Sequence, residues 1–167
     1  MFVELDRITE IGLDTLKNLI EFVAYDLSEL NGSDISEEGS FVPSLNLRDW
    51  YESQNYDLFF IRVDGKIAGF VIIKNIVEEG IYYLNHFFIL KKFRKKNVGK
   101  EAAFKAFNLY AGNWRVSEFD WNVPAQIFWR KVVNEYTNGQ FTDTRRKDNK
   151  GPAQEFKNFF NNDEALS

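Results

Sequence analysis

Apolar and polar residues repeat along the chain with two periods, and these periods predict its elements. Alternating or continuous apolar runs, which are typical of strands, cover residues 2–9, 57–63, 66–76, 81–90, 114–121, 140–146 and 153–160. Apolar residues spaced three and four apart predict helices over residues 16–30, 98–111 and 123–136, with a short helix inside 45–55. This order predicts an α+β fold, with one central mixed, mostly antiparallel sheet flanked by about four helices.

Turn-forming residues mark the ends of several predicted elements. Gly12 ends the first strand, and Asp14 or Thr15 is the predicted N-cap of the first helix. Asp64-Gly65 predicts a hairpin between the second and third strands. The third strand, residues 66–76, has no polar face, so we expect it to be central and covered on both sides.

A basic turn follows the apolar run of residues 81–90 and precedes a predicted helix. The start of a helix carries unpaired N–H groups and the positive end of its dipole, so a turn of this kind can bind an anion. A solvated charge run and a nucleic-acid patch are the alternatives. The turn contains five cations, Lys91, Lys92, Arg94, Lys95 and Lys96, followed by Asn97 and Gly99, which tolerate tight backbone.

Composition narrows the possible classes of protein. The 167 residues include 17 Phe, which is consistent with one packed domain over residues 1–160, and residues 161–167 are expected to form a frayed tail. The sequence has no apolar run long enough to span a membrane, so we expect a cytoplasmic protein. With no Cys and one His, a metal site is not expected. The net charge of −4 argues against nucleic acid as a partner.

Two motifs resemble those of the GNAT superfamily of N-acetyltransferases. Arg94-x-x-Asn97-x-Gly99 resembles its Q/R-x-x-G-x-G/A signature, with Asn97 in place of the first glycine. Asn is the non-glycine residue best suited to a positive φ, so this is a mild departure. The second motif resembles N-x-x-A-x-x-F-Y-x-K, and its matching residues are Asn122, Ala125, Phe128 and Lys131. The resemblance covers residues 57 to 136.

The resemblance implies a sheet that splays between its fourth and fifth strands and binds acetyl-CoA as the acyl donor. The backbone of Phe88, Ile89 and Leu90 is then expected to hold the pantetheine arm, and amides from Lys95 to Lys100 the pyrophosphate. The implied reaction is direct transfer of the acetyl group to a primary amine, on a small molecule or a peptide, in a ternary complex. The full set of expected coenzyme A contacts is Phe88, Ile89, Leu90, Arg94, Lys95, Lys96, Asn97, Val98, Gly99, Lys100, Asn122, Phe128 and Trp129.

His86 is the candidate base that removes a proton from the amine. It is the only His, its ordinary pKa is near neutral, and it lies on the strand that would border the thioester. Asn85 and Tyr83 are candidates for ordering a water, and a core role is the alternative for His86. Trp129 stands where the family usually has Tyr, and its indole N–H cannot release a proton usefully, so a core role is the alternative for it. Asn122 is equally suited to capping a helix.

The resemblance also places the first helix beside the acceptor. Tyr25, Asp26 and Glu29 are therefore candidate contacts for a cationic amine, and a solvated helix face is the alternative. Two other functions stay open: a catalytically weak module that binds or senses acyl-CoA, and a binder of nucleic acid or acidic protein that uses the basic turn. The protein is expected to be a monomer or a homodimer.

Overall fold

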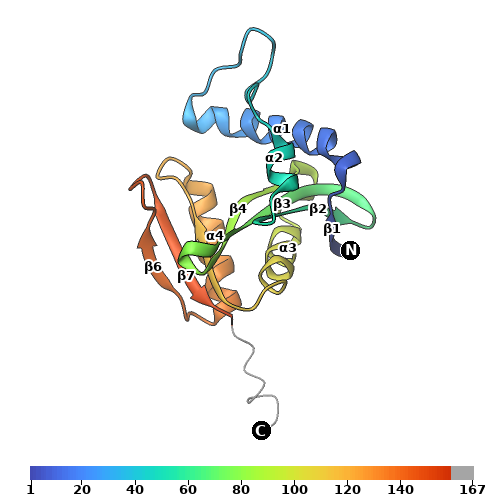
Figure 1. Cartoon of the computed structure of the whole chain (residues 1–167). Helices are drawn as coiled ribbons and strands as arrows, with labels where there is room; N and C mark the ends of the chain where they lie inside the picture. The colour runs from blue at the N-terminus through green and yellow to red at the C-terminus, as the bar shows by residue number, and fades with distance from the viewer. Residues whose placement is uncertain (159–167) are drawn as a thin grey trace.

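Seven strands form one sheet in the order β1-β2-β3-β4-β5-β7-β6 (Figure 1). The structure is a computed structural model and describes residues 1–158. The element order matches the order predicted from the sequence, and four α-helices accompany the sheet in the described residues. The strands are β1 Val3–Arg7, β2 Tyr56–Val63, β3 Lys66–Ile76, β4 Ile81–Ile89, β5 Asn113–Ser117, β6 Thr142–Arg145 and β7 Pro152–Lys157. The helices are α1 Leu13–Asn31, α2 Leu47–Glu52, α3 Val98–Phe107 and α4 Val123–Thr137, with 3-10 turns at Glu10–Gly12, Val77–Glu79 and Lys91–Phe93.

Helices cover both faces of the sheet and divide the core in two. Leu16 of α1 and Leu47 of α2 pack with Phe70 and Ile72 of β3 on one face. The helices α3 and α4 pack on the other face, which we call the α3 face, around the fully buried Trp114. Strand β3 lies third in the sheet and is buried along its middle, as its apolar sequence predicts. Among the described residues, no helix is long and apolar enough to cross a membrane.

The sheet opens between β4 and β5. These two strands are parallel and pair only at their start, where Ile81–Tyr83 face Asn113–Arg115. Along the described chain, β4 from Leu84 onward therefore has no strand partner on the β5 side. Every other neighbouring pair of strands is antiparallel. The predicted splay between the fourth and fifth strands is confirmed.

A β-bulge at Asn85 changes which face the side chains of β4 occupy. Ile72 of β3 pairs with His86 and the next residue, Ile73, pairs with Leu84, so Asn85 is the extra residue. Leu84 packs in the core of the α3 face, whereas His86 lies on the face covered by α1 and α2. Simple alternation would place Leu84 and His86 on the same face. The bulge therefore separates His86 from the core on the α3 face.

Several element boundaries differ from the predictions. Helix α1 starts one residue before Asp14, with Gly12 as its N-cap, because the preceding 3-10 turn leads directly into it. Helix α3 ends at Phe107 instead of residue 111, and β5 ends at Ser117 instead of residue 121. After Ser117, Glu118 and Asp120 donate backbone hydrogen bonds to Pro152 and Lys150, so the chain turns along the start of β7. The predicted strand end at residues 159–160, the domain boundary at residue 160 and the tail at 161–167 lie outside the described residues.

Candidate functional site

The basic turn leads into α3 with left-handed backbone. Lys95 has φ 59° and Asn97 has φ 66°, which agrees with the preference of Asn for positive φ. The backbone hydrogen bonds of α3 begin with the Glu101 N–H, which donates to the Asn97 carbonyl at 3.1 Å. The N–H groups of Val98, Gly99 and Lys100 precede that bond, as the orphan donors of a helix start do. The turn thus directs backbone N–H groups and the helix dipole toward one place.

Gly99 allows close contact between α3 and α4. A Cβ built on Gly99 would lie 3.0 Å from the Phe128 ring, so a side chain there needs Phe128 to move. Phe128 and Trp129 also pack against Phe87 of β4, with ring centroids 6.1 and 4.9 Å apart. Trp129 is 7 % exposed and belongs to the core of the α3 face. These residues join α3, α4 and β4 beside the splay.

Asp26 of α1 pairs with the cations of the basic turn. Arg94 donates to Asp26 at 2.8 Å and to the Ile89 carbonyl at 2.8 Å, and Lys91 lies 3.3 Å from Asp26. Burial raises the pKa of Asp26, but its hydrogen bonds and charge interactions with Arg94 and Lys91 outweigh this, so the pKa is lowered. The Arg94 guanidinium and the Asp26 carboxylate thus bind each other. Lys92, Lys95 and Lys96 are exposed.

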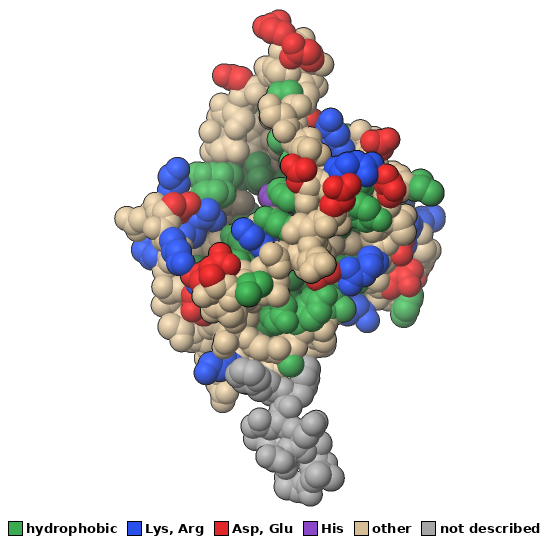
Figure 2. All heavy atoms as spheres, in the orientation of Figure 1, with side chains coloured by type: hydrophobic (Ala, Val, Ile, Leu, Met, Phe, Trp, Pro, Cys, Tyr) green, Lys and Arg blue, Asp and Glu red, His purple; other side chains and the backbone are tan. Residues whose placement is uncertain are grey.

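His86 lies at the bottom of a hollow between the sheet and α2. In Figure 2 the single histidine, in purple, is visible inside this hollow beside green apolar side chains. The residue keeps exposed surface, yet surrounding atoms bury enough of the imidazole to lower its pKa below 6.5. The ring of Trp50 lies 5.4 Å from the imidazole, centroid to centroid, and stacks on Tyr56 at 5.5 Å. His86 is therefore mainly neutral at pH 7 and can accept a proton.

Tyr83 and Ser117 bridge β4 and β5 at the closed end of the splay. Their hydroxyl oxygens lie 2.6 Å apart, and Arg146 donates to Ser117 at 3.1 Å. The Arg146 guanidinium also lies 4.1 Å from the ring centroid of Phe119. Asn85 is half-buried at the bulge between Tyr83 and His86. Tyr83, Asn85 and His86 are close along β4 by sequence alone, and the structure adds Ser117 and Arg146 beside Tyr83, which the sequence motifs did not indicate.

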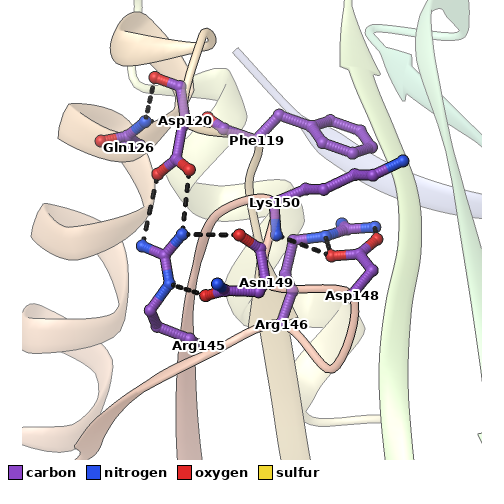
Figure 3. A network of polar contacts seen from close by, with 8 residues as sticks. All are labelled: Phe119, Asp120, Gln126, Arg145, Arg146, Asp148, Asn149 and Lys150. Carbon is purple, nitrogen blue, oxygen red and sulfur yellow. Dashed lines mark hydrogen bonds and ion pairs between the residues drawn. The ribbon is translucent and has the colours of Figure 1, made fainter.

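A polar network fixes the loop between β6 and β7 beside this cluster (Figure 3). Arg145 donates to both carboxylate oxygens of Asp120, at 3.3 and 2.9 Å, and to the side chain of Asn149 at 2.8 Å. Arg146 and Asp148 form two parallel hydrogen bonds of 3.0 and 2.9 Å. Asp148 also accepts the Lys150 N–H at 2.9 Å. The loop is therefore held against the segment that follows β5.

On α1, Glu21 is bonded to the loop before α2. It accepts a hydrogen bond from the Ser40 hydroxyl and from the backbone N–H groups of Phe41, at 2.8 Å, and Val42, at 3.2 Å. These hydrogen bonds, the Ser40 one first, lower the pKa of Glu21. Tyr25 is 68 % exposed, with its ring 6.2 Å from that of Phe41, and Glu29 is exposed. Of the three predicted acceptor contacts, only Asp26 is joined to the basic turn.

Glu118 is a buried acid that neither sequence motif contains. It is 4 % exposed, and neither carboxylate oxygen has a hydrogen-bond partner among the described residues. Burial raises its pKa to about 7. The fully buried Gln154 of β7 is close enough to Glu118 to oppose this rise in pKa, although its side-chain atoms form no hydrogen bond of normal geometry within residues 1–158. On the α4 side, Asn122 accepts the Ala125 N–H at 3.2 Å and so caps α4.

Comparison with known proteins agrees with this geometry. An acetyltransferase from Thermus thermophilus superposes with a TM-score of 0.73 at 13 % identity, covering 95 % of this chain and 98 % of that one. The PaiA N-acetyltransferase from Thermoplasma acidophilum, solved with coenzyme A, gives 0.64 at 16 % identity, covering 95 % and 100 %. A putative streptothricin acetyltransferase from Bacillus anthracis, solved with acetyl coenzyme A, gives 0.60 at 12 % identity, with the same coverage.

No curated protein matches the chain in sequence. The acetyltransferase (GNAT) family, by contrast, matches residues 24–133, which include β4, the basic turn, α3 and most of α4. At these low identities the solved structures establish the fold, and the family match covers more than half of the sequence. The chain therefore belongs to the acetyltransferase (GNAT) family.

Proposed function

We propose that the protein transfers an acetyl group from acetyl-CoA to a primary amine by direct attack within a ternary complex. The observation that carries this proposal is the combination of an unpaired β4 edge with a left-handed turn at the start of α3. The edge offers main-chain groups to an extended amide-containing arm, and the turn offers N–H groups to phosphates. Coenzyme A has both parts. The two structural neighbours that contain coenzyme A or acetyl-CoA support the choice of donor.

The backbone from Phe88 to Leu90 and the amides from Lys95 to Lys100 are the proposed donor contacts. The Arg94 guanidinium is bonded to Asp26 and to the Ile89 carbonyl. Arg94 would therefore contact the donor through its backbone, and its side chain would fix the position of Ile89. Asn122, Phe128 and Trp129 would support this surface from α4, where Asn122 caps the helix and the two rings pack on Phe87.

His86 is the proposed base. The neutral imidazole accepts a proton from the acceptor, directly or through a water ordered by Asn85 or Tyr83, while the amine nitrogen bonds to the acetyl carbon. The carbon–sulfur bond then breaks, and the leaving thiolate takes its proton from solvent, because the residue at the usual Tyr position is the core residue Trp129. The sum is amine plus thioester giving amide plus thiol, and His86 returns its proton to solvent.

The test starts with donor binding. Acetyl-CoA should raise the Tm of the wild type, and Gly99→Glu should abolish the rise, because the carboxylate adds negative charge at the turn and the side chain displaces Phe128. The matched control is Lys105→Glu, at an exposed position in the last turn of the same helix, which should bind normally. Circular dichroism checks that both variants fold. Unchanged binding in folded Gly99→Glu would rule out the proposed donor site.

A module that binds acyl-CoA without turnover is the second candidate, and the buried Trp129 favours it. Thiol release from acetyl-CoA, measured over a panel of amines, separates the two. Release that depends on the amine supports the transferase, whereas binding without release for every amine supports the sensing module. The nucleic-acid alternative is less favoured, because Lys91 and Arg94 are paired with Asp26.

A further inference from the structure

The hollow above His86 has an aromatic side wall. Trp50 of α2 lies 5.4 Å from the imidazole and 5.5 Å from Tyr56, which it stacks upon with an interplanar angle of 10°. Trp50 and Tyr56 are half-buried, and His86 is exposed, so each residue keeps surface that a ligand can contact. The hollow therefore presents aromatic surface beside the group that can accept a proton.

Two acids of α1, Asp26 and Glu21, are already bonded to other groups. The Asp26 carboxylate is paired with Arg94 and Lys91, and Glu21 accepts three hydrogen bonds from the loop before α2. One cation lies next to the aromatic wall, because Lys74 Nζ is 5.6 Å from the Tyr56 ring centroid. A second positive charge on the acceptor would be repelled there, and a planar apolar group would not.

We propose that the acceptor is a primary amine carried on a short linker by an aromatic ring, and that this ring packs against the part of Trp50 that Tyr56 leaves uncovered and so places the amine at His86. This inference rests on the proposed transferase function and specifies its substrate class. A contact between aromatic rings, offset-stacked or edge-to-face, uses the ring quadrupole in addition to area burial, so an aromatic ring should bind better here than a saturated ring of the same size.

The experiment compares three amines by thiol release: 2-phenylethylamine, 2-cyclohexylethylamine and spermidine. We expect kcat/KM for the aromatic amine to exceed that for the saturated one by about threefold to tenfold. Trp50→Ala should remove this preference, mainly by raising KM, and Trp50→Phe should keep most of it. The matched control is Tyr51→Ala, the exposed neighbour on the same helix. The Kd for acetyl-CoA should stay the same in all variants.

A binding measurement makes the inference testable even without turnover. Calorimetric titration of 2-phenylethylamine into protein saturated with coenzyme A should give a signal in the wild type and in Trp50→Phe, and none in Trp50→Ala. Amine-dependent thiol release with spermidine preferred and Trp50→Ala without effect would overturn the inference and leave the transferase intact. Absence of both release and aromatic-amine binding would also overturn it, and acetyl-CoA binding would then point to the sensing module.

Discussion

At the scale of single residues, His86 and Glu118 show how the same cause has opposite consequences. Burial lowers the pKa of the His86 imidazole and raises the pKa of the Glu118 carboxyl, because both groups favour their neutral form when water is removed. For His86 the neutral form is the one that accepts a proton. For Glu118 the neutral form is the one that the fold tolerates.

If His86 is the base, activity should depend on its neutral form. We expect kcat/KM to rise with pH through a midpoint below 6.5, because burial lowers the pKa. His86→Ala should lower kcat by about 10²- to 10⁴-fold, abolish that limb of the profile and leave the Kd for acetyl-CoA unchanged. Rates are measured at matched folded concentration. A variant with normal kcat and the same profile would assign His86 to packing and not to catalysis.

Glu118 should make stability fall as the pH rises. Below pH 4.5 the carboxyl is protonated in both folded and unfolded chains. Between 4.5 and about 7 the unfolded chain loses the proton while the folded chain keeps it, so the free energy of unfolding declines by roughly 3 kcal/mol and then stays level. Arg130 on α4, Asp143 on β6, Arg146 after β6 and Gln154 on β7 are the groups that also act on its pKa.

Urea unfolding of wild type and Glu118→Gln across this pH range measures the effect. The difference in unfolding free energy between the two should grow in favour of the variant from pH 4.5 to 7, because Gln cannot ionise. Glu29→Gln, at an exposed position on α1, is the control and should follow the wild type. A difference that does not change with pH would mean that the pKa of Glu118 is not raised by folding.

At the scale of elements, the basic turn and α3 were predictable because their determinants are local. Asn and Gly at positions 97 and 99 indicate a turn with left-handed backbone, and the helical spacing of apolar residues indicates the helix. The end of β5 and the bulge at Asn85 have no such local determinant, because they arise where a strand meets its neighbours. The candidate site divides in the same way. The sequence motifs indicated β4 and the basic turn, but Trp50 lies near His86 only because α2 packs on the sheet, which no local pattern predicts.

The left-handed conformation of Asn97 gives a test at this scale. Asn97→Gly should keep stability and acetyl-CoA binding, because glycine adopts φ 66° without strain. Asn97→Val should lose about 1–2 kcal/mol of stability and bind acetyl-CoA more weakly, since a β-branched residue resists this conformation. Thermal unfolding with and without acetyl-CoA measures both effects. Equal behaviour of Gly and Val would mean that the turn takes another conformation.

At the scale of the whole molecule, the splay divides the sheet into β1–β4 and β5–β7–β6, which pair with each other along only a short stretch. Arg115 is central to that junction. It is bonded to Glu79, before β4, at 3.0 Å and to Glu155 of β7 at 2.9 Å, and its side chain is 16 % exposed. Glu79 also pairs with Lys147 of the loop between β6 and β7.

Replacing Arg115 should therefore weaken one part of the sheet more than the other. We expect Arg115→Met to cost roughly 1–3 kcal/mol, because two carboxylates lose a partner that is mostly buried. Hydrogen exchange should speed up in β5 and β7 more than in β2 and β3. Arg62→Met, which breaks the pair with Asp6 at the β1–β2 edge, is the control and should not produce this pattern. Uniform acceleration across the sheet would show that the two parts open together.

The extra residue in β4 also makes the strand sensitive to chain length. Deleting Asn85 would remove no ion pair and no buried apolar group, yet it would restore strict alternation through the strand. Either the segment before Asn85 or the segment after it would then have to rotate by half a turn about the strand axis. In the second case the imidazole would enter the core under α3, and Phe87 would emerge into the hollow. The one extra residue in this strand thus decides whether the His86 imidazole lies in the hollow or in the protein interior.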